Sequence, residues 1–443
     1  MKLKSITIGG FKNLQKTRIE LQKIVSIVSS NNYGKSNLLE AIDFGTTFLS
    51  ANEKDRKSMM RWVSGIPINK TLANENFFFE IEFVTDSEDD YKYVKYGFTF
   101  AWYKDDGSGQ RITDEWIEAR PNESVKYTSF LKRTEGKYRK EKNTSSFRKI
   151  RLDDCQLAID MIALLEELPI QPFVKAIKRI DYRVCSSLDL GDRFQPNFID
   201  YITDDDDGEI AFDDKDVPRA IYRLSQMDSE KYDLFLEAVY TLFPDFLDVS
   251  IEQYAVKTSE DSSLQMVLSA GDDDDSPKTE MEKIPFKIKD EIYRVFIKSK
   301  YINQPINITR MSTGTKRIFW LLANVFIASS LKMSFVGIEE LETSIHPKLL
   351  KNLLEFLDEV LDDTSLIISS HSPFLIQYIK PEKIYIGVPS HDGTAVFKKI
   401  KGVRIKQLLN LARDHNMSLG EYVFELLSGD SDDEDILSFY LEG

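Results

Sequence analysis

The chain has 443 residues, and 58 Lys and Arg against 73 Asp and Glu give it a formal net charge of −15. Hydrophobic residues make up 42%, enough for at least one large core, and the length is typical of two or three domains. The acidic balance argues against a protein that coats nucleic acid, because such surfaces are basic overall. Two cysteines, Cys155 and Cys185, with no CxxC pair, exclude a disulfide scaffold and a zinc knuckle.

The N-terminus lacks the apolar run of a signal peptide, and no uncharged apolar stretch reaches the roughly 20 residues of a transmembrane helix. We therefore expect a cytoplasmic protein. In the first part of the chain, apolar and alternating runs predict a helix at 38–49 and strands at 5–8, 24–28, 77–102, 115–119 and 127–131.

Residues 152–182 and 218–243 are predicted to be helical. From about residue 283, strands and helices alternate, which indicates a parallel sheet with crossover helices. Much of the negative charge lies in acidic runs that we interpret as loops and a solvated tail, at 204–207, 272–275 and 430–435.

A phosphate-binding loop is predicted at residues 29–37, SSNNYGKSN, between a strand and a helix. Main-chain N–H groups at a helix N-terminus bind phosphate, Lys35 would reach the β- and γ-phosphates, and Ser36 would place its hydroxyl on Mg²⁺. Gly34 allows close approach of the backbone, whereas Ser29 replaces the first glycine of the usual GxxxxGK[ST] pattern. The remaining predicted nucleotide-binding residues of the loop are Asn31, Asn32, Tyr33 and Asn37.

Four later motifs follow in a fixed order, each at a strand or helix boundary. They are STGTK at 312–316, SFVGIEE at 334–340, LETSIHP at 341–347 and LIISSHSP at 366–373. A buried strand ending in Glu339 and Glu340 is how a Mg²⁺ ligand and a water-activating base are supplied. Each motif alone has a plainer interpretation: a helix cap, a solvated strand end, a connecting loop, or a structural histidine at His371. Together they favour a nucleotide site.

The motifs IVSIVSSNNYGKSNLLEAI, MSTGTKR, FVGIEELETSIHP and SLIISSHSPFLI resemble the ABC-type ATPase heads of the structural-maintenance-of-chromosomes (SMC) and RecF group. More narrowly, they resemble the prokaryotic AAA-family ATP-binding proteins of the overcoming-lysogenization-defect (OLD) type, which act in anti-phage abortive infection. The resemblance implies an α/β split P-loop head: a mixed-sheet N-terminal lobe (1–150), a mostly helical insertion (151–284) for dimerisation or partner docking, and a parallel-sheet C-terminal lobe (285–443).

The resemblance also implies a role for each matched residue. Lys35 and Ser36 belong to the Walker A motif, Glu339 is the Mg²⁺-binding Walker B acid, Glu340 is the general base and His371 is the switch histidine. Ser312 and Gly314 match the signature motif, which contacts the γ-phosphate of ATP bound to another subunit, and residues 341–344 match the D-loop. No Q-loop glutamine is found, since there is no Gln between positions 22 and 110.

ATP and Mg²⁺ are therefore the expected cofactors, and an ATP-dependent homodimer or a higher homo-oligomer is the expected assembly. OLD nucleases carry a Toprim nuclease after the ATPase, and the roughly 70 residues after His371 lack its pattern. We therefore expect an ATP-gated sensor or scaffold for a separate toxic effector, such as a nuclease encoded nearby. A RecF- or SMC-like DNA repair ATPase is the alternative, and a transporter subunit fits least because of the insertion.

Residues 132–151 form a basic stretch that DNA, or a phage trigger protein that mimics DNA, would fit. A solvated hairpin is the plainer interpretation. Two glutamates oppose nine basic residues, for a local charge of +7, and the nine are Lys132, Arg133, Lys137, Arg139, Lys140, Lys142, Arg148, Lys149 and Arg151.

Overall fold

The computed structural model describes residues 2–61, 66–85, 91–104, 106–134, 137–139, 148–149, 152–163, 171–178, 180–185, 193–201, 216–256, 286–388, 390–429 and 431–442. The chain divides into two compact units, one of residues 1–188 with 328–443 and the other of residues 189–327. These units cut the chain at positions other than the predicted boundaries near 150 and 284, so the three-part division remains a prediction.

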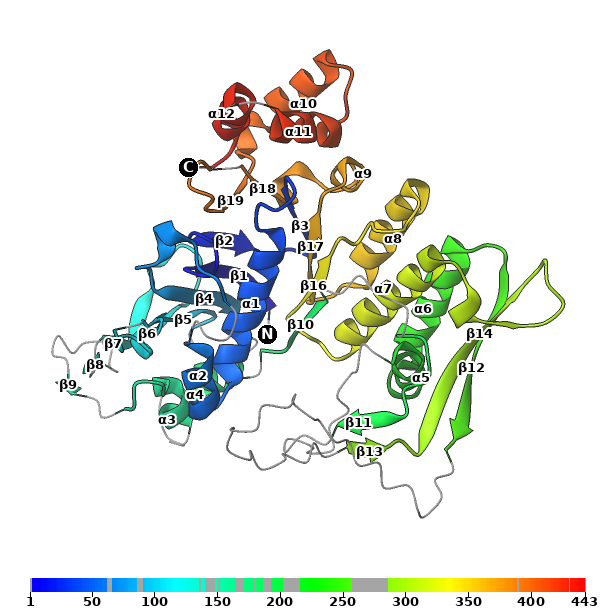
Figure 1. Ribbon diagram of the computed structural model, residues 1–443, viewed down its shortest axis with the longest axis horizontal. Helices are drawn as coiled ribbons and strands as arrows, with labels where there is room; N and C mark the ends of the chain where they lie inside the picture. The colour runs from blue at the N-terminus through cyan, green and yellow to red at the C-terminus, as the bar shows by residue number, and fades with distance from the viewer. Residues whose placement is uncertain are drawn as a thin grey trace, which may run out of the picture. The chain divides into compact units, whose positions relative to one another are not determined.

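The first unit contains an eight-stranded sheet in the order β2-β1-β4-β5-β6-β7-β8-β9 (Figure 1). Its described pairs are all antiparallel, rather than mixed as predicted, because most of its neighbouring strands are hairpin partners. The strands predicted at 5–8, 77–102, 115–119 and 127–131 are confirmed in this sheet, and the strand predicted at 24–28 is confirmed in the second sheet. The strands are β1 (Lys2–Gly9), β2 (Thr17–Glu20), β4 (Phe77–Val84), β5 (Tyr93–Ala101), β6 (Arg111–Arg120), β7 (Thr128–Thr134), β8 (Lys137–Arg139) and β9 (Arg148–Lys149).

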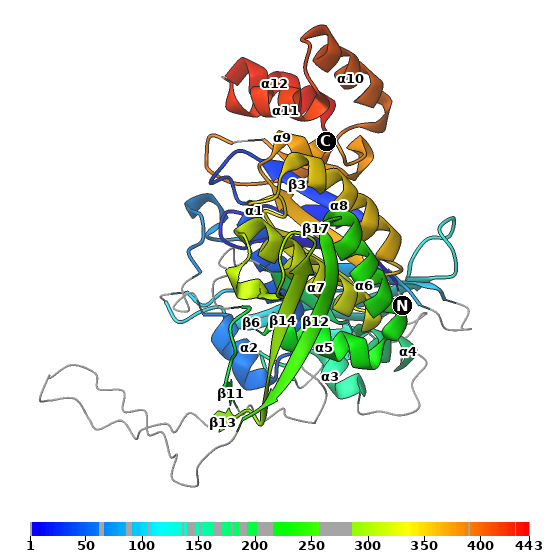
Figure 2. The same cartoon turned by 90° about the vertical axis from the view of Figure 1, so that its right-hand side faces the viewer.

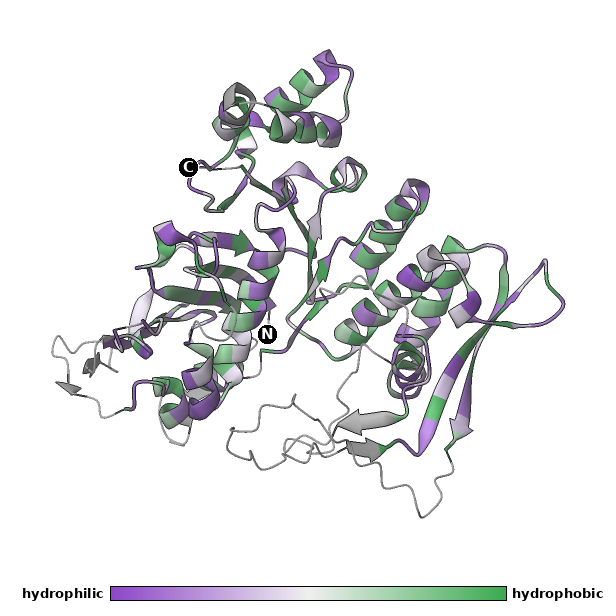
Figure 3. Ribbon diagram, in the orientation of Figure 1, coloured by the Kyte–Doolittle hydropathy of each residue, from purple (hydrophilic) through white to green (hydrophobic). Residues whose placement is uncertain are grey.

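The predicted strand at 24–28, β3, belongs to a second sheet in the same unit, in the order β10-β16-β17-β3-β18-β19. Its pairs are parallel except for the hairpin of β18 with β19. β3 and β17 are buried along their whole length, as strands covered on both faces are, and Figure 3 shows their hydrophobic residues. The strands are β3 (Ile24–Ser29), β10 (Tyr182–Cys185), β16 (Phe335–Glu339), β17 (Ser365–Ser370), β18 (Ile384–Gly387) and β19 (Phe397–Lys399).

Helix α1 (Lys35–Ser50) packs against strands of both sheets. Phe44 and Phe48 of α1 join an aromatic cluster with Phe77 and Phe100, in which the Phe48 and Phe100 ring centroids lie 4.8 Å apart. The helix that follows the phosphate loop is therefore fixed by the main hydrophobic core. The helices α2 (Glu53–Met59), α3 (Ala158–Ala163) and α4 (Gln171–Lys178) also pack on this core. The same unit contains α8 (Pro347–Val360) and α9 (Pro373–Ile376).

The second unit combines helices with a three-stranded and a two-stranded sheet. β12 (Phe246–Ala255) and β14 (Glu291–Ser299) form a long antiparallel pair, seen side by side in Figure 2, and β15 (Ile306–Asn307) pairs with β14. β11 (Ile199–Tyr201) pairs with β13 (Phe286–Ile288). The predicted helical segment 218–243 is confirmed as α5 (Val217–Met227) and α6 (Ser229–Leu242), and α7 (Thr313–Ser330) begins in this unit.

The C-terminal segment after the β18–β19 hairpin forms three helices, α10 (Ile405–Asp414), α11 (Leu419–Ser428) and α12 (Ser431–Tyr440). Residues 431–435 of the predicted tail begin α12, and Asp435 is exposed, as a solvated tail requires, whereas Leu437 and Tyr440 further along the helix are buried. Asp430 and the acidic runs at 204–207 and 272–275 lie outside the described residues. Within the described part of the chain, no helix combines the length and apolar character needed to cross a membrane.

Candidate functional site

The phosphate loop connects the end of β3 to the start of α1. Gly34, at the N-terminus of α1, has φ 129°, and a Cβ atom there would lie 2.9 Å from Oδ1 of Asn13, so only glycine fits without strain. Asn32 has φ 61°, a left-handed conformation that asparagine tolerates. Asn31, Asn32 and Ser36 are exposed, which leaves this loop open to a ligand.

Lys35 lies buried in the loop, where its Nζ atom donates hydrogen bonds to the main-chain oxygens of Ser29 and Ser30, each at 3.0 Å. Burial lowers the pKa of Lys35, and the nearby carboxylates of Glu340, Glu342 and Glu339 partly oppose this shift. Phosphate oxygens are stronger partners for an ammonium group than carbonyl oxygens, since charge-assisted hydrogen bonds are about twice as strong. A bound phosphate would therefore compete favourably with the main-chain oxygens of Ser29 and Ser30 for the Lys35 ammonium group.

Asn13, which the sequence analysis did not select, holds the loop in place. Its Nδ2 atom donates to the main-chain oxygen of Tyr33 at 2.9 Å, and its Oδ1 atom accepts from Asn37 at 2.8 Å. The buried Tyr33 hydroxyl accepts a hydrogen bond from the N–H of Val396 at 3.2 Å, and its ring packs edge-on against Phe397. The side chains of Tyr33 and Asn37 therefore connect the loop to residues of the surrounding fold: Asn13, Val396 and Phe397.

Glu339 ends β16 beside the phosphate loop, and its carboxylate hydrogen-bonds to Ser36. Burial raises the pKa of Glu339, and the Ser36 hydrogen bond opposes that rise. A serine hydroxyl and a carboxylate side by side are oxygen ligands of the kind that Mg²⁺ takes together with phosphate oxygens and water. These two residues therefore fit the predicted metal site.

The next residue, Glu340, has φ 44°, so the chain turns sharply after β16. Thr343 Oγ1 donates to Glu340 Oε2 at 3.1 Å, and Nδ1 of His371 lies 3.5 Å from Glu340 Oε1. His371 directly follows β17, the neighbour of β16 in the sheet. Because the carboxyl ends of parallel strands meet at one edge of a sheet, β3, β16 and β17 bring the phosphate loop, both acids and the histidine together.

Glu342 is a further member of this cluster that sequence reasoning missed as a site residue. Its Oε1 atom accepts hydrogen bonds from Ser370 Oγ at 2.7 Å and from the N–H of His371 at 3.2 Å. The sequence signal was a third glutamate in the EELE run, but only the fold shows that it reaches the neighbouring strand.

Ser312 and Gly314, the predicted signature residues, belong to the unit of residues 189–327. The Ser312 side chain accepts a hydrogen bond from the N–H of Thr315 at 3.2 Å, as an N-cap of α7 does. Ser312 is nevertheless exposed, so its position leaves it accessible to another molecule. Its role in nucleotide binding remains a prediction.

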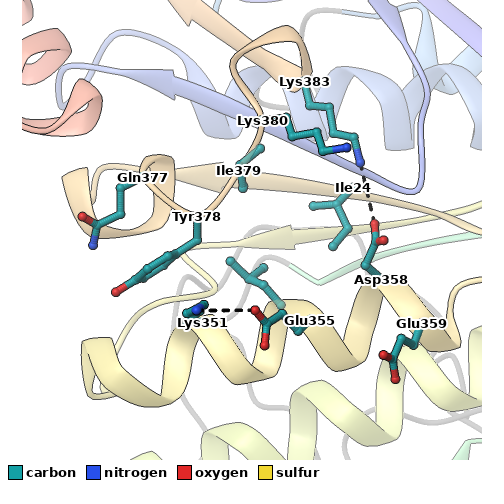
Figure 4. A pocket seen from close by; sticks show the side chains of 11 residues that line it. Ile24, Lys351, Glu355, Asp358, Glu359, Gln377, Tyr378, Ile379, Lys380 and Lys383 are labelled. Carbon is teal, nitrogen blue, oxygen red and sulfur yellow. Dashed lines mark ion pairs between the residues drawn. The ribbon is translucent and has the colours of Figure 1, made fainter. Parts of the chain in front are cut away.

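A groove of about 490 Å³ lies between α8 and the segment 377–383 (Figure 4). Opposite charges pair along it, with Lys351 Nζ 3.7 Å from Glu355 Oε1 and Lys383 Nζ 3.7 Å from Asp358 Oδ1. None of the predicted nucleotide-binding residues lines this groove, so it is separate from the cluster around the phosphate loop.

The basic stretch is only partly available as a surface. Arg133 was predicted as one of its members, but the side chain is buried, hydrogen-bonds to the main-chain oxygen of Gln156 and lies 3.7 Å from the buried carboxylate of Glu115. Lys132 is exposed on β7. Lys140, Lys142 and Arg151 lie outside the described residues.

Comparison with known proteins now adds to this geometry. The family model described as "AAA ATPase domain" matches residues 1–376. No curated protein matches the chain. In structure, the chain is similar to the SMC head domain from Thermotoga maritima, with 11% identity over 90% of this chain and 100% of that chain and a TM-score of 0.43.

It is also similar to a solved Smc head bound to the C-winged helix domain of ScpA, with 13% identity over 91% of this chain and 99% of that chain and a TM-score of 0.51. This likeness shows the fold, which is that of an SMC-type ATPase head. The family match covers most of the sequence and includes the phosphate loop, both acids and the histidine. The chain therefore belongs to the AAA ATPase domain family.

Proposed function

We propose that this ATPase is an ATP-gated switch, in which two copies close around bound ATP and separate after hydrolysis. The observation that carries the proposal is the meeting of Lys35, Ser36, Glu339, Glu340 and His371 at one edge of the parallel sheet. In the proposal, Lys35 binds phosphate, and Ser36 and Glu339 supply oxygen ligands for a metal ion. Glu340 is the base, and His371 is a second polar group beside it.

In the proposed reaction, Lys35 exchanges the carbonyl oxygens of Ser29 and Ser30 for the β- and γ-phosphate oxygens. Ser36 and Glu339 would hold Mg²⁺, which when bound neutralises charge on the phosphates. Glu340 orients a water molecule and accepts its proton, and its carboxylate is already fixed on one side by Thr343. His371, beside Glu340, stabilises charge on the transferred phosphoryl group.

Closure of two copies would complete the site. Ser312 is exposed at the N-terminus of α7, an 18-residue helix whose positive end favours an anion. The signature residues of one copy would contact the γ-phosphate held by the other, so ATP would bridge the copies and hydrolysis would release them. This is a switch that depends on the γ-phosphate.

Glu340→Gln tests the proposal because it keeps the size of the side chain and removes the base. We expect this variant to bind ATP with wild-type affinity, to hydrolyse it about 100-fold or more slowly, and to accumulate as an ATP-bound dimer in size-exclusion chromatography. Glu355→Gln, an exposed position on α8, is the matched control and should behave as wild type. Normal turnover by Glu340→Gln would refute the assignment.

As the biological setting we propose anti-phage defence, in which the switch controls a separate toxic effector. The support is the resemblance of the ordered motifs, from the phosphate loop through MSTGTKR and FVGIEELETSIHP to SLIISSHSPFLI, to OLD-type proteins. A solved Smc head bound to a winged-helix domain gives a precedent in this fold for a head that binds another protein. The test is affinity purification of the chain with ATP, followed by identification of co-purifying proteins. Recovery of the product of a neighbouring gene supports the proposal, and phage resistance conferred by this chain alone contradicts it.

The second candidate is a DNA repair ATPase of the SMC or RecF kind, favoured by the fold and by the basic residues of β7, β8 and β9. It predicts ATP-dependent DNA binding that weakens when Lys137 and Arg139 are both changed to Ala, with a reduced salt dependence of the affinity. Unchanged DNA affinity in that variant would exclude this surface.

A further inference from the structure

Glu342 carries a buried carboxylate that the proposed reaction does not use directly. Its side chain is only 9% exposed, although it lies three residues beyond the end of β16. The turn that follows β16 brings it back toward the sheet: Thr343 N–H donates to the main-chain oxygen of Glu340 at 3.0 Å, and Ile345 N–H donates to that of Glu342 at 3.0 Å. Buried Leu341 anchors the turn.

The Glu342 carboxylate contacts the C-terminal end of β17, the strand beside β16, where Ser370 is followed by His371. Glu342 Oε1 accepts from Ser370 Oγ at 2.7 Å and from the His371 N–H at 3.2 Å, and the same Ser370 hydroxyl accepts from the N–H of Ser372 at 3.0 Å. One carboxylate oxygen thus fixes three consecutive residues, 370–372, in one conformation.

His371 needs such a support because its side chain is 43% exposed and is therefore not held by packing. Its Nδ1 atom faces two carboxylates, at 3.5 Å from Glu340 Oε1 and 3.8 Å from Glu342 Oε1. Both carboxylates lie on the Nδ1 side of the ring, so Nε2 is directed away from them. Glu342 therefore contacts His371 twice, through its main-chain N–H and on the Nδ1 side of its ring.

We propose that Glu342 is a positioning residue that orients His371 against Glu340 within one subunit, so that ATP hydrolysis depends on it although it does not touch the nucleotide. This inference rests on the proposed function. The burial of the residue argues that its purpose is not stability: among the described residues, no donor reaches Oε2 of Glu342, and a buried carboxylate oxygen without a donor costs free energy.

The test compares Glu342→Ala and Glu342→Gln in the full chain, each alone and combined with His371→Ala. We expect Glu342→Ala to lower kcat by about 100-fold with little change in KM, because a misplaced catalytic group costs rate and not ground-state binding. Glu342→Gln retains an oxygen acceptor for Ser370 and the His371 N–H, so it should recover part of that loss. Glu342→Gln keeps an acceptor for both donors, so it should unfold close to the wild-type temperature, and Glu355→Gln is the neutral control.

The double variants separate positioning from a general structural effect. If Glu342 acts through His371, adding Glu342→Ala to His371→Ala should cause no further loss of kcat, whereas independent effects would multiply. A further loss of similar size in the double variant, or a loss that appears only in KM or in thermal stability, would overturn the inference. The proposed function fails separately, if the wild-type chain hydrolyses no ATP or Glu340→Gln turns over normally.

Discussion

The carboxylate of Glu339 hydrogen-bonds to Ser36, although the two residues are far apart in the sequence. Their contact exists because β3 is inserted between β17 and β18, so that the phosphate loop of the first segment meets acids of the last segment. Burial raises the pKa of Glu339, and the Ser36 hydrogen bond limits this rise, which favours the ionised form that a metal requires.

The first prediction concerns this pair. Ser36→Ala should raise the Mg²⁺ concentration for half-maximal ATP hydrolysis by at least about tenfold, because a ligand oxygen is lost, whereas Ser36→Thr keeps the hydroxyl and should stay close to wild type. The measurement is a Mg²⁺ titration of phosphate release at fixed ATP. Identical Mg²⁺ dependence in the wild type and Ser36→Ala would remove Ser36 from the metal site.

The second prediction concerns the contribution of a second copy. Lys35→Met and Ser312→Arg should each abolish hydrolysis, because the first loses the phosphate cradle and the second blocks the proposed contact of α7 with the partner's nucleotide. Mixing the two variants should restore part of the activity, since a mixed dimer has one site with a wild-type Lys35 and a wild-type Ser312. If the mixture stays inactive while both variants still bind to each other, the signature residues do not act across the dimer.

The sequence predicted the parts of the site that depend on local pattern. Lys35, Glu339 and His371 each lie at a boundary between a strand and a loop or helix, and such boundaries are visible in apolar runs and glycine positions. Contacts made by long-range pairing were missed: the support of the phosphate loop by Asn13 and the reach of Glu342 to Ser370 depend on which strands become neighbours.

Sequence-based prediction also failed to identify which charged side chains are buried. Arg133 looked like one of nine basic residues on a surface, yet it lies beside Glu115 inside the fold. Burial raises the pKa of Glu115, and the N–H groups of Ala158 and Ile159, at the start of α3, and the charge of Arg133 oppose the rise. A strand sequence with both charged and apolar residues does not reveal which charge finds an internal partner.

The third prediction concerns the connection between α1 and α3. The buried Arg56 donates to the main-chain oxygens of Phe48 and Leu49 at the end of α1, at 2.8 and 3.0 Å, and pairs with Asp160 of α3. Asp160→Asn should lower the free energy of unfolding by about 1–3 kcal/mol at pH 7, because it leaves a buried guanidinium without its charge partner. Asp363→Asn breaks an exposed pair with Lys2 and should change it by less than about 0.5 kcal/mol.

The same variant makes a prediction about pH. Burial raises the pKa of Asp160, but hydrogen bonds from Arg56 and Lys178 outweigh it, so the folded-state pKa lies below the ordinary value of 3.8. The carboxylate therefore contributes its full stabilisation above that value and loses it as the pH falls through the folded pKa. The stability difference between wild type and Asp160→Asn should shrink below about pH 4. A difference that stays constant down to the lowest pH at which both remain folded would contradict the ion pair.

The fourth prediction tests how closely the phosphate-loop helix packs on the core. A Cβ atom on Gly45 of α1 would lie 2.2 Å from the ring of buried Phe79, so Gly45→Ala must displace the helix or the ring. Helix propensity alone would make alanine more stable by about 1 kcal/mol, whereas overpacking costs about 1–3 kcal/mol. We expect the overpacking to prevail, because Phe79 packs within 5.4 Å of Phe98, centroid to centroid, and has little room to move. Gly402→Ala, where no atom lies within 4 Å of the added Cβ, is the matched control for a glycine replacement.

Chemical denaturation should show a loss of stability for Gly45→Ala only, and a shift of α1 should also weaken ATP binding, since Lys35 and Ser36 form its first turn. A Gly45→Ala protein as stable as wild type, with unchanged ATP affinity, would mean that α1 adjusts to the core without moving the phosphate loop.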